Sequence, residues 1–126
     1  MPKTLLTFET VRDMALELAD VETGTAYGAA ALKVNGNVLA SVPVNKSAEA
    51  NSAVFRVDFE LRASLIKAKP DIYYVTDHYA GYPTVLVRLS NISRGELREL
   101  LGLSWSFVSA KKAARKSAAK SKKRRR

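Results

Sequence analysis

Cysteine is missing from this 126-residue chain, and histidine occurs only once. Without cysteine there can be no disulfide, no thiol nucleophile and no cysteine-ligated zinc. The single histidine, His78, gives a poor ligand set for a metal site, which needs several ligands. The glycine-rich patterns G-x-G-x-x-G and G-x-x-x-x-G-K-[ST], which bind phosphates at the start of a helix, do not occur. We therefore expect a non-enzymatic protein without a cofactor or a metal ion.

Long apolar runs are absent too. No stretch approaches the ~18 to 20 apolar residues that a membrane-spanning helix requires. The first residues, MPKTLLTFETVRD, lack the basic start and apolar stretch of a secretory signal. We therefore expect a cytoplasmic protein, which a nucleic-acid partner would place at the nucleoid, or in the nucleus of a eukaryotic cell.

Net positive charge is absent from most of the chain and concentrated at its end. Residues 109–126, which we name the basic tail, read SAKKAARKSAAKSKKRRR, with ten Lys or Arg and no acidic residue. The other 21 − 10 = 11 basic residues stand against all 12 Asp and Glu, so residues 1–108 carry 11 − 12 = −1. Like charges at the density of the tail repel one another and keep a segment solvated. The sequence predicts one domain over residues 1–108 and a disordered tail over residues 109–126.

Nucleic acid is the partner that the basic tail favours most. Each Lys or Arg that neutralises a phosphate releases a counterion, so the affinity depends on salt and little on base sequence. Because the tail has no aromatic residue on which unpaired bases would stack, duplex DNA or structured RNA suits it better than single strands, and we take duplex DNA as the partner. The candidate contacts in the tail are Lys111, Lys112, Arg115, Lys116, Lys120, Lys122, Lys123, Arg124, Arg125 and Arg126.

Other interpretations of the tail stay open. A charged segment also aids solubility. Anionic lipids attract Lys and Arg, but the chain offers no cysteine to lipidate and the tail no apolar anchor, so we expect no membrane partner. The final KKRRR resembles a nuclear localisation patch, which matters only in a eukaryotic cell.

Three helices follow from apolar residues at helical spacing and from their capping residues. They cover residues 8–20, residues 59–69 and a run that begins at Ser93, with Thr7, Asp58 and Ser93 as N-caps. Pro70 ends the second helix, and Glu96 completes a capping box with Ser93. The apolar stripe of the last helix consists of Leu97, Leu100, Leu101, Ser104, Trp105 and Val108, which makes Trp105 a core residue.

The remaining segments predict an antiparallel sheet. Asn35-Gly36 between apolar runs favours a type I′ hairpin turn. That turn would set Leu32 opposite Leu39 and Ala31 opposite Ala40. Further strands are predicted at residues 53–57, with Phe55 inward and Arg56 outward, and at residues 72–76 and 84–89, with Val85, Val87 and Leu89 on one side. The pattern indicates an α+β fold in which a sheet of about five strands packs against helices.

Two turns carry the candidate contacts of the folded part. Residues 77–83, DHYAGYP, hold the histidine and two tyrosines. The plainer interpretation is a connection between strands whose tyrosines pack on the edge of the sheet. The alternative is a wing in which His78, Tyr79 and Tyr82 contact nucleic acid. Lys33, beside the Asn35-Gly36 turn, would lie on a second wing. Adjacent Asp77 and His78 do not by themselves show the geometry of a catalytic pair.

Part of the chain resembles a known family, the MmcQ/YjbR-like proteins. The resemblance rests on residues 77–83 (DHYAGYP), 84–89 (TVLVRL), 96–101 (ELRELL) and 104–105 (SW), and on Gly28, residues 32–36 (LKVNG) and Leu39-Ala40. It covers roughly residues 8 to 110, and the basic tail lies outside it. The resemblance implies a CyaY-like α+β domain with a double-wing arrangement and the description of a DNA-binding protein.

Three functions are compatible with these observations. The first is a nucleic-acid-binding protein in which the domain positions or regulates and the tail supplies affinity. The second is a protein-interaction module, in which the domain binds a protein partner or itself and the tail is an auxiliary tether. The third is an enzyme or a small-molecule binder with a pocket around His78 and Tyr82. We take the first as the working hypothesis.

Overall fold

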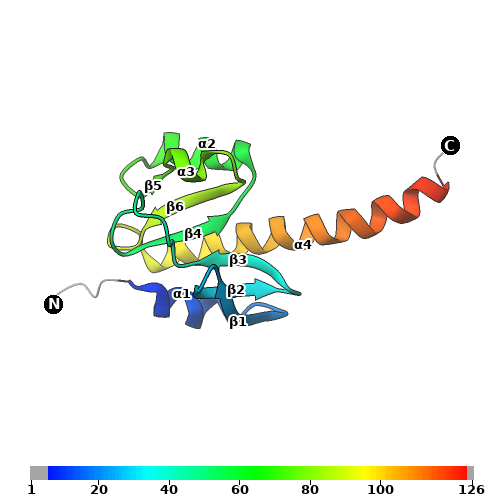
Figure 1. The fold of residues 1–126 in the computed structure, drawn as a ribbon, viewed down its shortest axis with the longest axis horizontal. Helices are drawn as coiled ribbons and strands as arrows, with labels where there is room; N and C mark the ends of the chain where they lie inside the picture. The colour runs from blue at the N-terminus through cyan, green and yellow to red at the C-terminus, as the bar shows by residue number, and fades with distance from the viewer. Residues whose placement is uncertain (1–5, 125–126) are drawn as a thin grey trace.

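The computed structural model describes residues 6–124, with side chains described as far as residue 109. Its elements are α1 (Phe8–Ala15), β1 (Val21–Ala26), β2 (Ala29–Val34), β3 (Asn37–Ser41), β4 (Ser52–Arg56), α2 (Phe59–Ala68), β5 (Tyr73–Tyr74), α3 (Asp77–Ala80), β6 (Thr84–Arg88) and α4 (Arg94–Arg124). The strands form one six-stranded antiparallel sheet in the order β1-β2-β3-β4-β6-β5 (Figure 1). The predicted α+β fold is confirmed, with one strand more than expected.

Each face of the sheet carries its own apolar cluster. The larger core lies under α1 and α4, where α4 packs against β2, β3 and β4 (Figure 1). Apolar side chains of α2 pack against the same core. On the opposite face, Tyr79 of α3 packs with Val54 and Leu86 in a smaller cluster. We call the side that holds α4 the inner face and the side that holds α3 the outer face.

The Asn35-Gly36 turn has the conformation that the sequence predicts, but the pairing beyond it is shifted. Both residues have positive φ, at 52° and 86°, as a type I′ turn requires. Lys33 pairs with Val38, whereas Leu32 pairs with Ala40 because a bulge adds one residue to β3. The expected pairs of Leu32 with Leu39 and of Ala31 with Ala40 are therefore wrong by one residue. The bulge lets the consecutive Leu39 and Ala40 both reach the core.

The strand that the sequence did not predict is β1. It joins β2 through a second two-residue turn, Tyr27-Gly28, in which both residues again have positive φ, at 55° and 81°. The register runs from Val21 opposite Val34 to Ala26 opposite Ala29 without a bulge. Four of the six residues of β1 are exposed, so the strand forms one edge of the sheet.

Two further segments differ from their predicted structure. The first helix ends at Ala15, because residues 16–20 turn back toward β1 and Asp20 adopts a positive φ of 63°. The connection of residues 77–83 contains the short helix α3 and is not an extended wing. The predicted caps are confirmed for α2, where the Asp58 side chain accepts a hydrogen bond from the Leu61 N–H, and for α4. Ser93 Oγ accepts from the Glu96 N–H, and Glu96 in turn accepts from the Ser93 N–H.

Candidate functional site

The helix α4 joins the core to the basic tail. Five of the six residues of the predicted stripe are each at most 5% exposed: Leu97, Leu100, Leu101, Ser104 and Val108. The sixth, Trp105, is only partly buried. The backbone of α4 then continues as a helix to Arg124, beyond the sheet (Figure 1). The predicted contacts from Lys111 to Arg124 lie on this helix, although their side chains are outside the described residues. Arg125 and Arg126 lie outside the described residues altogether.

The helical backbone differs from our expectation of a disordered tail, and the difference has a physical reason. Starting a helix is costly because several residues must be fixed before the first hydrogen bond forms, whereas extending one is nearly neutral for alanine and lysine. Residues 94–108 are held by the core, so they supply the nucleus that an isolated basic segment would lack. The boundary after residue 108 stays a prediction, and one helix crosses it.

Polar contacts fasten the core part of α4 at several points. Trp105 packs against the core and donates its indole N–H to the carbonyl oxygen of Ala19, 2.8 Å away. Near the start of the helix, Lys69 forms an ion pair with Glu96. This pair lowers the pKa of the Glu96 carboxyl and raises the pKa of the Lys69 ammonium. The core part of α4 is therefore held by one polar contact near its start and by another near the beginning of the tail.

Lys33, the predicted contact of the second wing, is partly exposed on the outer face of β2. Its side chain extends across the neighbouring strand: a Cβ built on Gly24 of β1 would lie 3.5 Å from Lys33 Cδ and Cε, and 3.8 Å from Nζ. The ammonium therefore lies over β1, at the edge of the sheet, rather than at the Asn35-Gly36 turn.

Tyr79 is not available as a nucleic-acid contact in this structure. Its side chain is only 9% exposed, because it fills the outer cluster against Val54 and Leu86. The hydroxyl oxygen accepts a hydrogen bond from the Asn45 N–H at 3.4 Å. His78 packs edge-on against the Tyr79 ring, and both His78 and Tyr82 of this connection are exposed. The plainer interpretation of residues 77–83, a packed connection, fits the structure.

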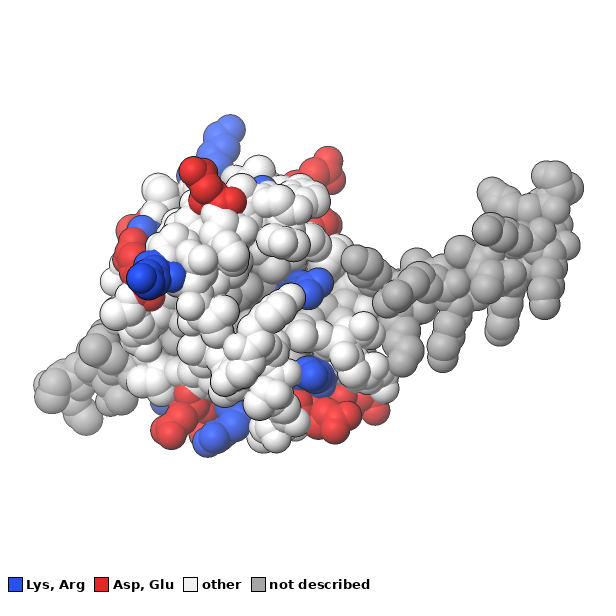
Figure 2. All heavy atoms as spheres, viewed as in Figure 1, with Lys and Arg blue, Asp and Glu red and all other residues white. Residues whose placement is uncertain are grey.

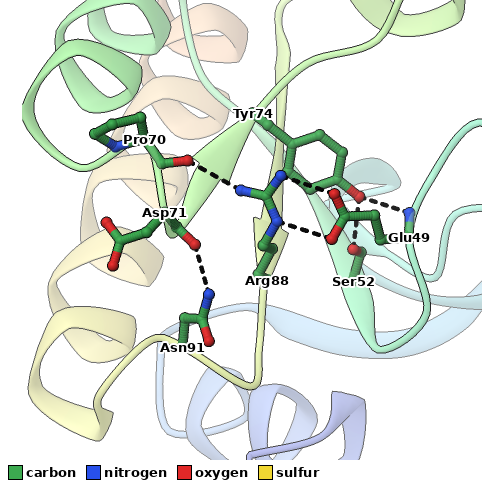
Figure 3. Close-up of polar contacts among 7 residues, drawn as sticks. All are labelled: Glu49, Ser52, Pro70, Asp71, Tyr74, Arg88 and Asn91. Atoms are coloured by element: carbon green, nitrogen blue, oxygen red, sulfur yellow. Dashed lines mark hydrogen bonds and ion pairs between the residues drawn. The ribbon is translucent and has the colours of Figure 1, made fainter.

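The densest polar network of the described residues lies on the outer face around Arg88, and the sequence did not predict it (Figure 3). The guanidinium donates to both carboxylate oxygens of Glu49, at 2.8 and 2.7 Å, and to the carbonyl oxygen of Pro70 at 3.0 Å. It also stacks over the ring of Tyr74, 4.2 Å from the centroid. The Tyr74 hydroxyl accepts from the Glu49 N–H and shares a second hydrogen bond with Ser52 Oγ.

The electrostatics of this network point to a structural clamp. The hydrogen bonds from Arg88 lower the pKa of Glu49, and the same contact raises the pKa of Arg88. Both partners are thereby held in their charged forms at neutral pH. Because the two residues are 39 positions apart in the sequence, no local pattern could have paired them. The clamp holds the segment between β3 and β4 against β5 and β6.

The described residues contain no group of three or more His, Cys, Asp or Glu placed to hold a metal ion. Within the same part of the chain, no helix has the length and the apolar character to cross a membrane. On the face shown in Figure 2, basic and acidic side chains are interspersed around a largely uncharged centre. This face carries no large patch of one sign. In the sequence, charge of one sign is most concentrated in the basic tail.

Comparison with known proteins gives relatives for part of the chain. Over 54 residues it is 39% identical to uncharacterized proteins of Mycobacterium tuberculosis and Mycobacterium bovis. The match covers 43% of this chain and only 42% of the length of those relatives. No protein-family model matches the chain, and no solved structure matches it.

Proposed function

We propose that this protein binds nucleic acid without catalysing a reaction, and that the basic tail supplies the affinity. One observation carries the proposal: residues 1–108 have a net charge of −1, whereas the 18 residues that follow have +10. Solubility alone does not require ten cations within 18 residues. On a polyanion such as duplex DNA, each cation that neutralises a phosphate releases a counterion and so increases the affinity. The partner would be duplex DNA in the cytoplasm or nucleoid.

The fold supports this function through α4. The root of the helix is fixed by its buried stripe and by the Trp105 hydrogen bond, and the same helix continues into the basic tail. A tail that starts from a fixed helix reaches the phosphates with less loss of conformational freedom than a fully flexible chain. The domain would thus orient the tail, while the tail makes phosphate contacts that carry no sequence information.

We also retain the MmcQ/YjbR-like, CyaY-like assignment as part of the proposal. An antiparallel sheet with helices packed on its inner face is compatible with it. The double-wing mode of binding draws less support, because Tyr79 is buried and the Lys33 ammonium lies away from its turn. The contacts proposed for nucleic acid are therefore those of the tail.

Two variants with equal loss of charge test the proposal. In the tail variant, Lys111, Lys112, Arg115 and Lys116 are changed to Gln, which keeps helix propensity. In the matched control, Lys46, Arg56, Lys67 and Arg94 of the domain are changed to Gln. Fluorescence anisotropy with labelled duplex DNA at about 100 mM salt should show at least a tenfold loss of affinity for the tail variant and much less for the control. Equal losses would reject the tail as the binding element.

A further inference from the structure

The edge strand β1 presents unpaired backbone groups. Among the described strands, only β2 pairs with β1. In a hairpin with a two-residue loop, the residues that flank the loop exchange backbone hydrogen bonds, and the pattern then alternates along the strand. Starting from Ala26 opposite Ala29, this alternation turns the N–H and C=O groups of Val21, Thr23 and Thr25 away from β2.

This edge lacks several of the features that usually keep sheet edges from pairing. β1 has six residues, no proline and no bulge, and four of its residues are exposed. The charges at this edge are Glu22 of β1 and Lys33 of β2, whose side chain lies over Gly24. The opposite edge differs, because β5 is only two residues long and α2 packs beside it. One edge of the sheet is thus protected and the other is open to a further strand.

We propose that β1 pairs with β1 of a second copy of this chain, antiparallel and about a two-fold axis at Thr23. This proposal does not depend on the proposed nucleic-acid function. In this register the two Thr23 residues face each other, and Val21 faces Thr25 of the second copy. The outward backbone groups of both strands would be satisfied by about six new hydrogen bonds. The two sheets would join into one continuous sheet with an isologous interface.

Charge complementarity argues for a second copy as the occupant. In the register centred on Thr23, Glu22 of one copy lies opposite Gly24 of the other, on the outer face. The side chain that covers Gly24 is Lys33, whose Nζ lies 3.8 Å from the Cβ position of that glycine. Within one chain Glu22 is also the cross-strand partner of Lys33. Because the Lys33 side chain extends toward Gly24, each Glu22 carboxylate would meet the Lys33 ammonium of the second copy as well. The two-fold axis produces this ion pair twice, and no like charges face each other across the seam.

The neighbouring turn supplies a further argument. Tyr27, at the end of β1, is 91% exposed and has a φ of 55°, which a bulky residue rarely adopts. A strained backbone and an exposed ring in the same residue suggest that Tyr27 contacts another molecule. The Thr23-centred register would bring Tyr27 beside the start of β1 in the second copy, where the ring would be covered.

Sedimentation equilibrium measures the association of the full chain. The protein concentration should reach about 0.5 mM, because an interface of one strand pair is small and therefore weak. About 300 mM salt and nuclease treatment exclude association through nucleic acid. We expect a reversible monomer–dimer equilibrium. A chain that stays monomeric over the whole range overturns the proposal.

Two kinds of variant locate the interface. Thr23→Pro removes an N–H that faces away from β2, so it should abolish the dimer while the monomer still folds. Glu22→Lys and Lys33→Glu should each weaken the dimer about tenfold or more, and the double variant with both changes should restore it. Glu60→Lys, an equal change of charge on α2, is the matched control. A dimer that is as strong in Thr23→Pro and in the single charge variants as in the original chain would place the interface elsewhere.

Discussion

The indole N–H of Trp105 donates to the carbonyl oxygen of Ala19, 2.8 Å away, and so ties the last buried turns of α4 to the chain just before β1. This contact lies where the helix leaves the core and becomes basic. Because Trp105 carries no charge and precedes the basic tail, a change at this residue tests the stability of the domain separately from the binding properties of the tail.

Trp105→Phe should therefore lower stability without lowering affinity. The variant keeps an aromatic ring in the core but loses the hydrogen bond, which costs about 1 kcal/mol in the free energy of unfolding. Urea unfolding measures the loss. Affinity for duplex DNA, measured at a temperature where both proteins are folded, should change less than twofold. A large loss of affinity would mean that the anchor of α4 contributes directly to binding.

Removing the Arg88 guanidinium should destabilise the domain strongly. Arg88 is 26% exposed and contacts Glu49, Tyr74 and the Pro70 carbonyl, so Arg88→Met leaves the stem but deletes every polar contact. We expect the free energy of unfolding to fall by about 2 to 3 kcal/mol. Arg56→Met, on the neighbouring strand β4 of the same face, is the control and should cost less than about 0.5 kcal/mol. Similar losses in the two variants would contradict the clamp.

Acid should weaken the fold through Glu49 and Glu96. The partners Arg88 and Lys69 hold the pKa of these carboxyls below the ordinary value of 4.5. A group with a lowered pKa in the folded state stabilises the protein above its unfolded pKa, and this contribution is lost as the pH falls through the folded value. The melting temperature should be steady between about pH 7 and 5 and fall below about pH 4.5.

The variant with Glu49→Gln and Glu96→Gln tests the assignment of that acid transition. It should melt at a lower temperature than the original chain at pH 7 and lose less on acidification. If the two proteins lose the same number of degrees between pH 6 and pH 3, other carboxyls cause the transition.

Tyr27→Asn should stabilise the monomer. Asparagine adopts positive φ more readily than tyrosine and is favoured at the first position of a type I′ turn. We expect a gain of about 1 kcal/mol in the free energy of unfolding at low protein concentration. Tyr82→Asn is the control, since Tyr82 is also exposed but has no positive φ. A gain in both variants would show that strain at Tyr27 is not its source.

Local signals predicted much of this fold. The Asn35-Gly36 turn, the Asp58 cap and the Ser93–Glu96 capping box each depend on residues within a few positions, and each is confirmed. The sequence VETGTA of β1 has no alternation of bulky apolar residues, because an edge strand buries little, so it was missed. The bulge in β3 depends on the shape of the core, which cannot be inferred from a local sequence pattern.

For the candidate site, too, local features could be predicted from the sequence and long-range contacts could not. The charge of the basic tail is a property of composition, so the sequence alone shows it. The plainer interpretation of residues 77–83 packs the tyrosines on the sheet, and Tyr79 is buried there, but its partners Val54 and Leu86 could not be predicted because they come from two strands distant in the chain. The position of the Lys33 ammonium over Gly24 depends on the pairing of β1 with β2, and hence on a strand that the pattern did not reveal.

The most direct test of the tail as the binding element is the salt dependence of the affinity of the full chain for labelled duplex DNA between about 50 and 300 mM salt. If the tail neutralises about six phosphates, the logarithm of the association constant should fall against the logarithm of salt with a slope near −5, whatever the base sequence. The variant with four tail Gln substitutions should have a slope shallower by about 3. A slope near zero, or an equal slope in that variant, would contradict binding through the basic tail.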